Sequence, residues 1–326
     1  MLVLNFSTPT WLVNYYHFIG VTSFVLNSAT ICLILTKSTK IDNFRYFLLF
    51  FQILCTITDF HLTFLMQPMP LFPLISGFCT GFLAKYLDVW SHFLMAFMIS
   101  LIVSQVACLG HCFVKKHQTI AKIINRHIVP EKVYISSVTV SVCVPIFCYF
   151  VFCAAGMNRS DQLDYVEANF PEYLGGFESL PNFAIYTLNF WFLLLACVCF
   201  CGGVFGALLF TMTTLDMFRM LRGAQRKVSA ASFRRHQSAV KSLLAQFATS
   251  SLCLIPPFFF VIVIIAKPES AQTIVQVLLA IFTLHSTVNA VVLIVTTPPY
   301  RNFLLRINMK GKKISPMRGS NPRQPD

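Results

Sequence analysis

Charged residues are scarce in this chain of 326 residues, in which Asp, Glu, Lys and Arg together make up 11%. Soluble globular domains carry about 25%, so the composition excludes an ordinary water-soluble domain. Acidic residues are the scarcer sign, with 12 Asp and Glu against 25 Lys and Arg and a formal net charge of +13. Hydrophobic residues make up 56% of the chain and include 34 Phe, which also excludes an intrinsically disordered protein.

The sequence also lacks the spacing patterns of metal sites and of catalytic sites. Its 12 Cys contain no pair of C-x-x-C motifs of the zinc-binding kind. No spacing of His, Glu or Asp and no nucleophile motif indicates an enzyme. We therefore predict no catalytic residue, no bound metal and no cofactor.

Seven apolar runs are long enough to cross a membrane, which takes about 20 residues. Continuous backbone hydrogen bonding favours helices for such runs, so we predict an all-α integral membrane protein with a seven-transmembrane-helix bundle. The third run is ambiguous at its start, where Lys85 and Asp88 interrupt it, and its secure part is Ser91–Gly110. The fifth run is long enough to tilt or to project past the bilayer. The predicted spans, which make up a transmembrane domain over 12–297, are 12–36, 44–67, 80–110, 133–156, 183–212, 243–266 and 271–297.

Basic residues are distributed unequally between the two ends of the predicted helices. Of the 25 Lys and Arg, 22 fall in segments 37–45, 115–132, 219–241 and 301–323, which all belong to one end. The other end has three, namely Lys85, Arg159 and Lys267. Because basic connections remain on the cytoplasmic side, we expect the N-terminus outside the cell, the C-terminus inside, and the chain in the plasma membrane.

The end predicted to be external carries candidate modification sites. Two N-x-S/T sequons, at Asn5 and Asn158, both fall there and are candidate glycosylation sites. Residues 1–11 form the predicted extracellular N-terminus, without the features of a removed signal peptide. Cys79 lies in an external connection, where an oxidising environment permits a disulfide, and its nearest candidate partner is Cys153.

The predicted cytoplasmic connections present a basic face. Residues 215–238 indicate extensions of the fifth and sixth helices, and such a face suits an acidic protein or anionic lipid headgroups, although a solvated charge run is the alternative. The arginines of this face are Arg219, Arg222, Arg226, Arg234, Arg235 and Arg301. Residues 298–326 are predicted to begin with a segment along the membrane surface and to end in a disordered basic tail.

Polar residues inside apolar spans are costly and are therefore candidates for function. Asn27, Asp59 and Asn289 lie in the first, second and seventh spans and can form one hydrogen-bonded cluster. This cluster is interpreted either as a switch that repacks on activation, with or without a bound cation, or as a static network between helices. The doublet Pro256-Pro257 removes two backbone donors and predicts a kink in the sixth helix, which can serve as a pivot.

A second set of polar residues lies toward the external end. Lys85, Asp88 and His92 recur at helical spacing, so we expect them to share a face of the third helix, where Lys85 and Asp88 can pair. They are interpreted either as the lining of a ligand recess or as a structural ion pair beside a histidine. Further candidates for ligand contacts are His61, Gln67 and Gln105.

Several loose motifs stand in a fixed order along the chain. They are the run Asp59–Pro73 with Gly77-Phe78-Cys79-Thr80-Gly81 after it, His236-Gln237-Ser238 ahead of Leu243–Phe247, and His285-Ser286-Thr287 followed by Pro299-Tyr300-Arg301. Together, over nearly the whole chain, they resemble the serpentine chemoreceptors of nematodes, most of all serpentine receptor class I (Sri), with class H (Srh) as its close relative. The resemblance implies a G-protein-coupled receptor of chemosensory neurons, displayed on sensory cilia, that detects an unidentified small molecule.

The chain departs from the rhodopsin-like pattern in two places. The third helix has Leu109-Gly110-His111-Cys112-Phe113 where that pattern has Asp/Glu-Arg-Tyr, and the seventh helix lacks Asn-Pro-x-x-Tyr. The seventh span also contains no Lys, which excludes a retinal Schiff base. The sequence therefore leaves the activation switch undefined.

We predict a chemosensory receptor, important for olfaction and sensory transduction, that has no catalytic activity. Its expected partners are a small-molecule cue, a heterotrimeric G protein and membrane lipids, with no nucleic acid. A cue from outside shifts the arrangement of the fifth and sixth helices, and the basic face then engages the G protein. The alternative is a seven-helix transporter or ligand-gated channel, but the orientation opposes an insect-type odorant channel and no internal repeat favours a transporter. The residues expected to contact the cue are Lys85, Asp88, His92, His61 and Gln67.

Overall fold

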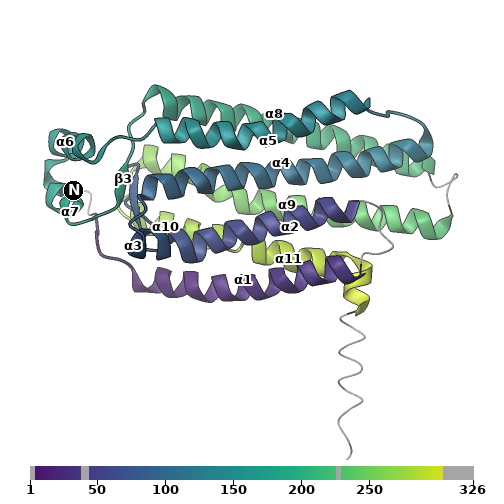
Figure 1. Ribbon diagram of the computed structural model, residues 1–326, viewed down its shortest axis with the longest axis horizontal. Coiled ribbons are helices and arrows are strands. Elements are labelled where there is room, and N and C mark those ends of the chain that lie inside the picture. Colours follow the sequence, from purple (N-terminus) through teal and green to yellow (C-terminus); the bar gives the residue numbers. More distant parts are fainter. Residues whose placement is uncertain (1–3, 38–43, 225–228, 304–326) are drawn as a thin grey trace, which may run out of the picture.

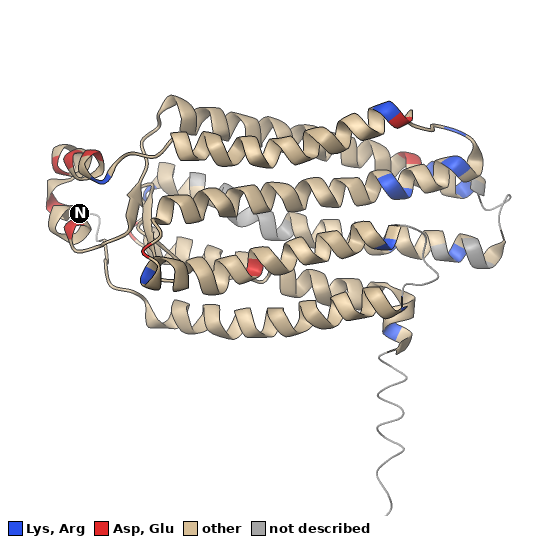
Figure 2. Ribbon diagram, viewed as in Figure 1, with Lys and Arg blue, Asp and Glu red and all other residues tan. Residues whose placement is uncertain are grey.

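The computed structural model describes residues 4–37, 44–224 and 229–303. Long helices lie side by side along the length of the molecule, and a small sheet with several short helices gathers at the end that holds the N-terminus (Figure 1). We name the opposite end the basic end, because most of the Lys and Arg shown in Figure 2 lie there. The first end is named the strand end, after its strands β1 (Pro68–Pro70), β2 (Ser76–Cys79) and β3 (Phe183–Ile185).

Seven helical crossings connect the two ends. In chain order they are α1 (Thr10–Lys37), α2 (Phe44–Phe60) continued by the π-helix η1 (His61–Met66), α4 (Ser91–Ile124), α5 (Glu131–Ala154), α8 (Phe190–Ala224), α9 (Ala230–Ala266), and α10 (Ala271–Thr283) continued by α11 (His285–Thr296). Counting the described residues alone, six of these crossings are long and apolar enough to span a membrane. The predicted all-α helical bundle is confirmed, with six of the seven predicted spans recovered among the described residues.

The bundle buries polar side chains together with its apolar core and leaves large apolar side chains exposed on its outside, as α1 illustrates. Its buried face repeats every three or four residues and includes Ser23, Asn27 and Thr30. Its exposed face carries Phe18 and Val25, which are 69% and 60% exposed. Such a surface is unfavourable in water, but lipid tails are as apolar as these side chains. The outside of the bundle therefore suits a hydrocarbon solvent.

The third crossing begins at Ser91, the start of its secure part, and not at the start of its full predicted range. Its predicted range, 80–110, contains a separate short helix, α3 (Phe82–Tyr86), and α4 begins only at Ser91. Asp88, between the two helices, has a φ of 52°, in the left-handed region that a right-handed helix excludes. This break ends α3 and lets the chain change direction before α4 starts.

The fifth crossing also starts later and runs further than its predicted range, 183–212. Residues 183–185 form β3, and α8 extends from Phe190 to Ala224. A short apolar run suits a buried strand as well as a helix, so its composition does not distinguish the two. At 1.5 Å per residue α8 is roughly 50 Å long, well above the roughly 30 Å of a hydrocarbon core. Its last turns therefore project past that core at the basic end.

The strand end forms a packed cover over the helix ends. In its sheet β2 lies between β1 and β3 and is antiparallel to both, with Met69 opposite Phe78. Phe6 of the N-terminal segment packs against Phe177, with ring centroids 5.2 Å apart. The short helices that precede β3 are α6 (Arg159–Asn169), the 3₁₀ turn η2 (Pro171–Tyr173) and α7 (Leu174–Glu178).

Aromatic side chains join the helices near the basic end. The ring of Phe210 on α8 lies 4.4 Å from that of Phe113 on α4 and stacks on Phe247 of α9 at 3.4 Å. Tyr300, in the helical residues 298–303 that follow α11, is fully buried in the same core. The predicted disordered tail lies outside the described residues from position 304 onward.

Candidate functional site

A buried polar cluster joins α1, α2 and α11 inside the bundle. Ser23 donates a hydrogen bond to Asp59. Asn27 Nδ2 donates to Ser23 Oγ at 3.0 Å and to Ser286 Oγ at 2.6 Å, and Gln52 Nε2 donates to Asn27 Oδ1 at 2.6 Å. All five side chains are buried. Because buried polar groups are costly unless they are hydrogen-bonded, the cluster fixes how the three helices pack.

Asn289 of α11 lies in a second buried cluster. Its Nδ2 is 3.1 Å from Ser250 Oγ of α9 and 2.8 Å from His285 Nε2. Its Oδ1 has no hydrogen-bond partner among the described residues. The single cluster of Asn27, Asp59 and Asn289 that the sequence predicts is thus two clusters, the first of which links Asn27 to Asp59 through a serine.

A narrow cavity is bordered by both clusters. Its free space suits only a few molecules of the size of water. Polar groups of Asp59, Gln105 and His285 reach it among mostly apolar neighbours from α2, α4, α9, α10 and α11. The full lining is Phe51, Cys55, Thr58, Asp59, Leu62, Ile102, Gln105, Val106, Leu109, Ser250, Phe282 and His285.

His92, in the first turn of α4, is buried in an aromatic cluster at the strand end. Its ring stacks on Phe152 of α5 with centroids 5.0 Å apart and lies 4.8 Å from the ring of Trp90. Its Nδ1 is 3.1 Å from Tyr186 Oη, and its Nε2 is 3.2 Å from the carbonyl oxygen of Cys153. The start of α4, the end of α5 and the segment before α8 therefore meet at this imidazole.

The prediction that Lys85, Asp88 and His92 share one helix face is wrong. Lys85 and Asp88 are exposed and do not pair. Asp88 Oδ1 instead accepts a hydrogen bond from Asn182 Nδ2 at 2.9 Å, and Lys85 Nζ lies 5.5 Å from the centre of the Tyr86 ring. The break between α3 and α4 leaves the two charges at the surface while His92 is buried.

His61 and Gln67, the other predicted ligand residues, lie at the two ends of η1. His61 Nε2 is 3.0 Å from the carbonyl oxygen of Leu94, and its ring meets Phe97 edge-on at 5.0 Å. Gln67 Nε2 donates to the carbonyl oxygen of Thr63 at 2.8 Å. Both side chains are buried, so they make contacts within the protein, unlike the two exposed charges.

The predicted disulfide between Cys79 and Cys153 is wrong, because both are free thiols. Cys79, at the end of β2, contacts the side chain of Ser91. Cys153 lies on α5, and its carbonyl oxygen contacts His92. The two cysteines thus contact neighbouring residues at the start of α4, and neither is joined to the other.

The predicted basic face comprises six arginines, of which the structure describes the side chains of four. Four are exposed, namely Arg219 and Arg222 near the end of α8, Arg234 near the start of α9, and Arg301 after α11. Arg226 and the side chain of Arg235 lie outside the described part of the chain. α9 continues as a helix through Pro256 and Pro257, whose side chains are likewise not described, so the predicted kink stays a prediction.

Both sequons lie at the strand end and are exposed. Asn158 immediately precedes α6. The backbone N–H of Asn5 donates to Gln272 Oε1 on α10 at 3.0 Å. Gln272 Nε2 in turn donates to the carbonyl oxygen of Asn5 at 2.8 Å. These bonds hold the N-terminal segment at the end opposite the basic residues, although glycosylation itself stays a prediction.

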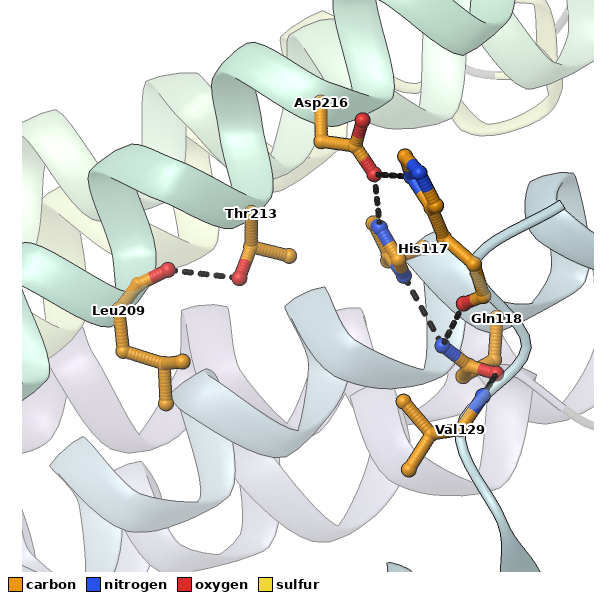
Figure 3. A network of polar contacts seen from close by, with 7 residues as sticks. His117, Gln118, Val129, Leu209, Thr213 and Asp216 are labelled. Atoms are coloured by element: carbon orange, nitrogen blue, oxygen red, sulfur yellow. Dashed lines mark hydrogen bonds and ion pairs between the residues drawn. The ribbon is translucent and has the colours of Figure 1, made fainter.

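Three titratable residues that the sequence does not single out meet at the basic end (Figure 3). His117 of α4 and His127, in the connection to α5, each lie 2.8 Å from Asp216 Oδ2 of α8. No local pattern reveals this group, because the packing of α4 on α8 brings it together. The part of the chain that the structure describes contains no group of three or more His, Cys, Asp or Glu arranged to hold a metal ion.

Comparisons with known proteins complete the description. The family model described as serpentine type 7TM GPCR chemoreceptor Sri matches residues 2–304. Among solved structures, the crystal structure of squid rhodopsin is similar over 92% of this chain and 85% of that chain, with a TM-score of 0.57 and 11% sequence identity. At that identity the likeness shows the fold alone. No curated protein matches the sequence.

Proposed function

Since the chain belongs to the Sri family of serpentine seven-transmembrane G-protein-coupled chemoreceptors, we propose that it binds a small molecule from outside the cell and signals to a heterotrimeric G protein. The observation that carries this proposal is a family match that covers residues 2–304. The proposed location is the plasma membrane of a sensory cilium.

The proposed orientation places the strand end outside the cell and the basic end in the cytosol. Figure 2 supports it, because Lys and Arg gather at one end of the bundle while most acidic residues lie at the other. Basic segments are retained on the cytoplasmic side during insertion. Both sequons, at Asn5 and Asn158, are then available for glycosylation.

The cavity bordered by Asp59, Gln105 and His285 is the inner part of the proposed ligand site. Because its free space suits only water-sized molecules, a larger cue requires the surrounding helices to separate. A cue that fits only the wider arrangement shifts the population toward that arrangement. The apolar lining with a few polar groups favours a small, largely apolar cue that carries one or two hydrogen-bonding groups.

Residues at the strand end have two different proposed roles. Lys85 and Asp88 are exposed and are available to a cue before it enters the bundle. His92, His61 and Gln67 are buried and act by holding the ends of α2, α4 and α5 in place around the entry route.

The basic end supplies the proposed contact for the G protein. Arg219 and Arg222 on α8 and Arg234 on α9 are exposed there, on the two helices that project furthest. A change in the spacing of α8 and α9 alters this cationic surface. Electrostatic complementarity of this kind governs the rate and specificity of docking to an acidic partner.

A reporter assay tests the proposed function directly. The full chain is expressed in cultured cells with a G-protein-dependent reporter, and small molecules are screened for a dose-dependent response. We expect at least one cue to give a response only in cells that express the chain, and Gln105→Leu, which changes the cavity lining, to weaken it. Gln237→Leu removes an exposed glutamine of α9 and is the matched control.

Two outcomes of this assay count against the proposal. A response that persists when the G protein is absent, together with an ion current or uptake of the cue, favours a channel or a transporter. A response that Gln105→Leu and Gln237→Leu leave equally unchanged places the ligand away from the cavity.

A further inference from the structure

One carboxylate oxygen connects three segments at the basic end. Asp216 Oδ2 of α8 is 2.8 Å from His117 Nε2 of α4 and 2.8 Å from His127 Nδ1. His127 belongs to the connection 125–130, which joins α4 to α5. The side chain of His117 is 11% exposed and that of His127 is 48% exposed, so the first contact is largely shielded from water and the second is only half shielded.

Gln118 makes a second tie between α4 and the same connection (Figure 3). Its Oε1 accepts a hydrogen bond from the backbone N–H of Val129 at 2.9 Å. Its Nε2 donates to the carbonyl oxygen of His127 at 3.3 Å and to His117 Nδ1 at 3.0 Å. The amide orientation is therefore set by the backbone, since a flipped amide would bring two donors together at Val129.

These contacts determine the form of His117. Because Gln118 Nε2 is a donor, His117 Nδ1 must be the unprotonated, accepting nitrogen. The proton of the neutral ring is then on Nε2, where it is donated to Asp216. This tautomer of His117 accepts a hydrogen bond from Gln118, which binds the connection, and donates one to Asp216 of α8. The contacts of Gln118 and of Asp216 therefore belong to one network.

The backbone of the connection depends on this network. Asn125 and His127 have φ values of 59° and 57°, in the left-handed region that residues other than Gly seldom adopt. Such a conformation persists where surrounding contacts hold it. For His127 those contacts are its carbonyl bond from Gln118 and its imidazole bond to Asp216.

We propose that His117, Asp216, His127 and Gln118 form a clasp that couples the conformation of connection 125–130 to the position of α8. When the end of α8 moves away from α4, the Asp216 carboxylate leaves both imidazoles. His127 then loses the contact that holds its backbone, and the Val129 N–H is freed as Gln118 reorients. The conformation of the connection thereby changes when α8 moves, through the side-chain contacts of Asp216.

Hydrogen exchange of the purified full chain in lipid nanodiscs tests the clasp without a cue or a G protein. In Asp216→Ala we expect exchange of the amides in 125–130, Val129 above all, to rise about tenfold, because the hydrogen bond that protects Val129 opens more often. Glu131→Ala removes an exposed acidic residue at the start of α5 and should leave that exchange as in the unchanged chain. Equal exchange in Asp216→Ala and the unchanged chain overturns the proposal, and so does an equal rise in Glu131→Ala.

A second variant distinguishes loss of the clasp from general unfolding of the protein. His127→Gly removes the imidazole that contacts Asp216 and also relieves the left-handed backbone, while the contact between His117 and Asp216 stays in place. If the clasp exists, combining it with Asp216→Ala raises exchange by less than the product of the two single effects, because both remove the same contact. Independent, multiplicative effects contradict the clasp. Neither readout depends on whether the chain signals.

Discussion

The carboxyl group of Asp59 is held by hydroxyl groups inside the bundle. Ser23 donates to it, and Asn27 bonds the same serine at 3.0 Å. A change at the carboxyl is therefore transmitted within α1 and, through the 2.6 Å bond from Asn27 to Ser286, to α11. This single residue is placed to affect how three helices pack.

Replacing Asp59 with Asn should alter signalling more than surface expression. The substitution keeps the shape but replaces one of the two acceptor oxygens, which the Ser23 and Ser286 hydroxyls contact, with an NH2 donor. A lost buried hydrogen bond costs about 1–3 kcal/mol. Because about 1.4 kcal/mol is a tenfold change in equilibrium constant, we expect a shift of about tenfold in the cue concentration for half-maximal response. Dose–response curves and surface staining measure the two effects.

The exposed Asp164 on α6 provides the control for this experiment. Asp164→Asn should leave the packing of α1, α2 and α11, the surface expression and the response to the cue unchanged. If Asp59→Asn lowers surface expression and signalling by the same factor, the cluster is a static network and has no part in switching.

Gly156, just after the end of α5, lies at a position where the surrounding protein leaves no room for a side chain. A Cβ atom at this position would lie 2.5 Å from His92 Nε2, so Gly156→Ala should displace the buried imidazole. Overpacking of this kind costs about 1–3 kcal/mol, and we expect a lower Tm of the purified protein. Gly175→Ala is the matched control, since its Cβ would have no neighbour within 4 Å. Equal Tm values for the two variants would refute the packing role of His92.

The sequence predicts only some of the buried polar residues and of the contacts between them. Asn27 and Asp59 stand out because each is an isolated polar residue in an apolar run, where burial is costly without a partner. Their actual connection through Ser23 does not stand out, since a serine is unremarkable in such a run. The contact of His117 with Asp216 spans 99 positions and exists only because α4 packs on α8.

Among the described elements, α8 and α9 are the longest, at 35 and 37 residues, and therefore reach well beyond a hydrocarbon core roughly 30 Å thick. They end and begin at Ala224 and Ala230, which agrees with the predicted extensions of the fifth and sixth helices. Arg219 and Arg222 are three residues apart on α8, so they lie on neighbouring positions of one helix face.

Replacing both Arg219 and Arg222 with Ala should weaken G-protein activation while leaving the bundle intact. The side chains are exposed, so their loss removes attraction for an acidic surface and not packing. We expect roughly a threefold to tenfold loss of activation rate, greatest at low salt, in a nucleotide-exchange assay with purified G protein. The double variant Arg159→Ala, Lys267→Ala, at the strand end, should have no effect, and a salt-independent loss would argue against electrostatic docking.

Sequence places the elements better than it places their ends. Apolar runs encode each crossing locally, which is why α1, α2 and α5 lie within a few residues of their predicted ranges. The full ranges predicted for the third and fifth crossings begin before α4 and α8, because apolar residues continue through α3 and β3. Only the left-handed backbone of Asp88 and the pairing of β3 with β2 end those runs, and both depend on tertiary structure.

On the scale of the whole molecule, apolar side chains and basic side chains have two different distributions. Apolar side chains face outward along the crossings, and basic side chains gather at one end (Figure 2). The first distribution matches a hydrocarbon solvent. The second gives the proposed direction of insertion, on which the external cue, the glycosylated sequons and the cytosolic contact for the G protein all depend.

Mapping of the two termini in intact cells tests this arrangement most directly. Chains tagged at both ends are stained before and after permeabilisation, and glycosidase treatment reports on Asn5 and Asn158. We predict that the N-terminal tag stains on intact cells, that the C-terminal tag stains only after permeabilisation, and that the glycosidase increases gel mobility. Both tags on the same side, or an N-terminal tag that stains only after permeabilisation with no mobility change, would contradict the account.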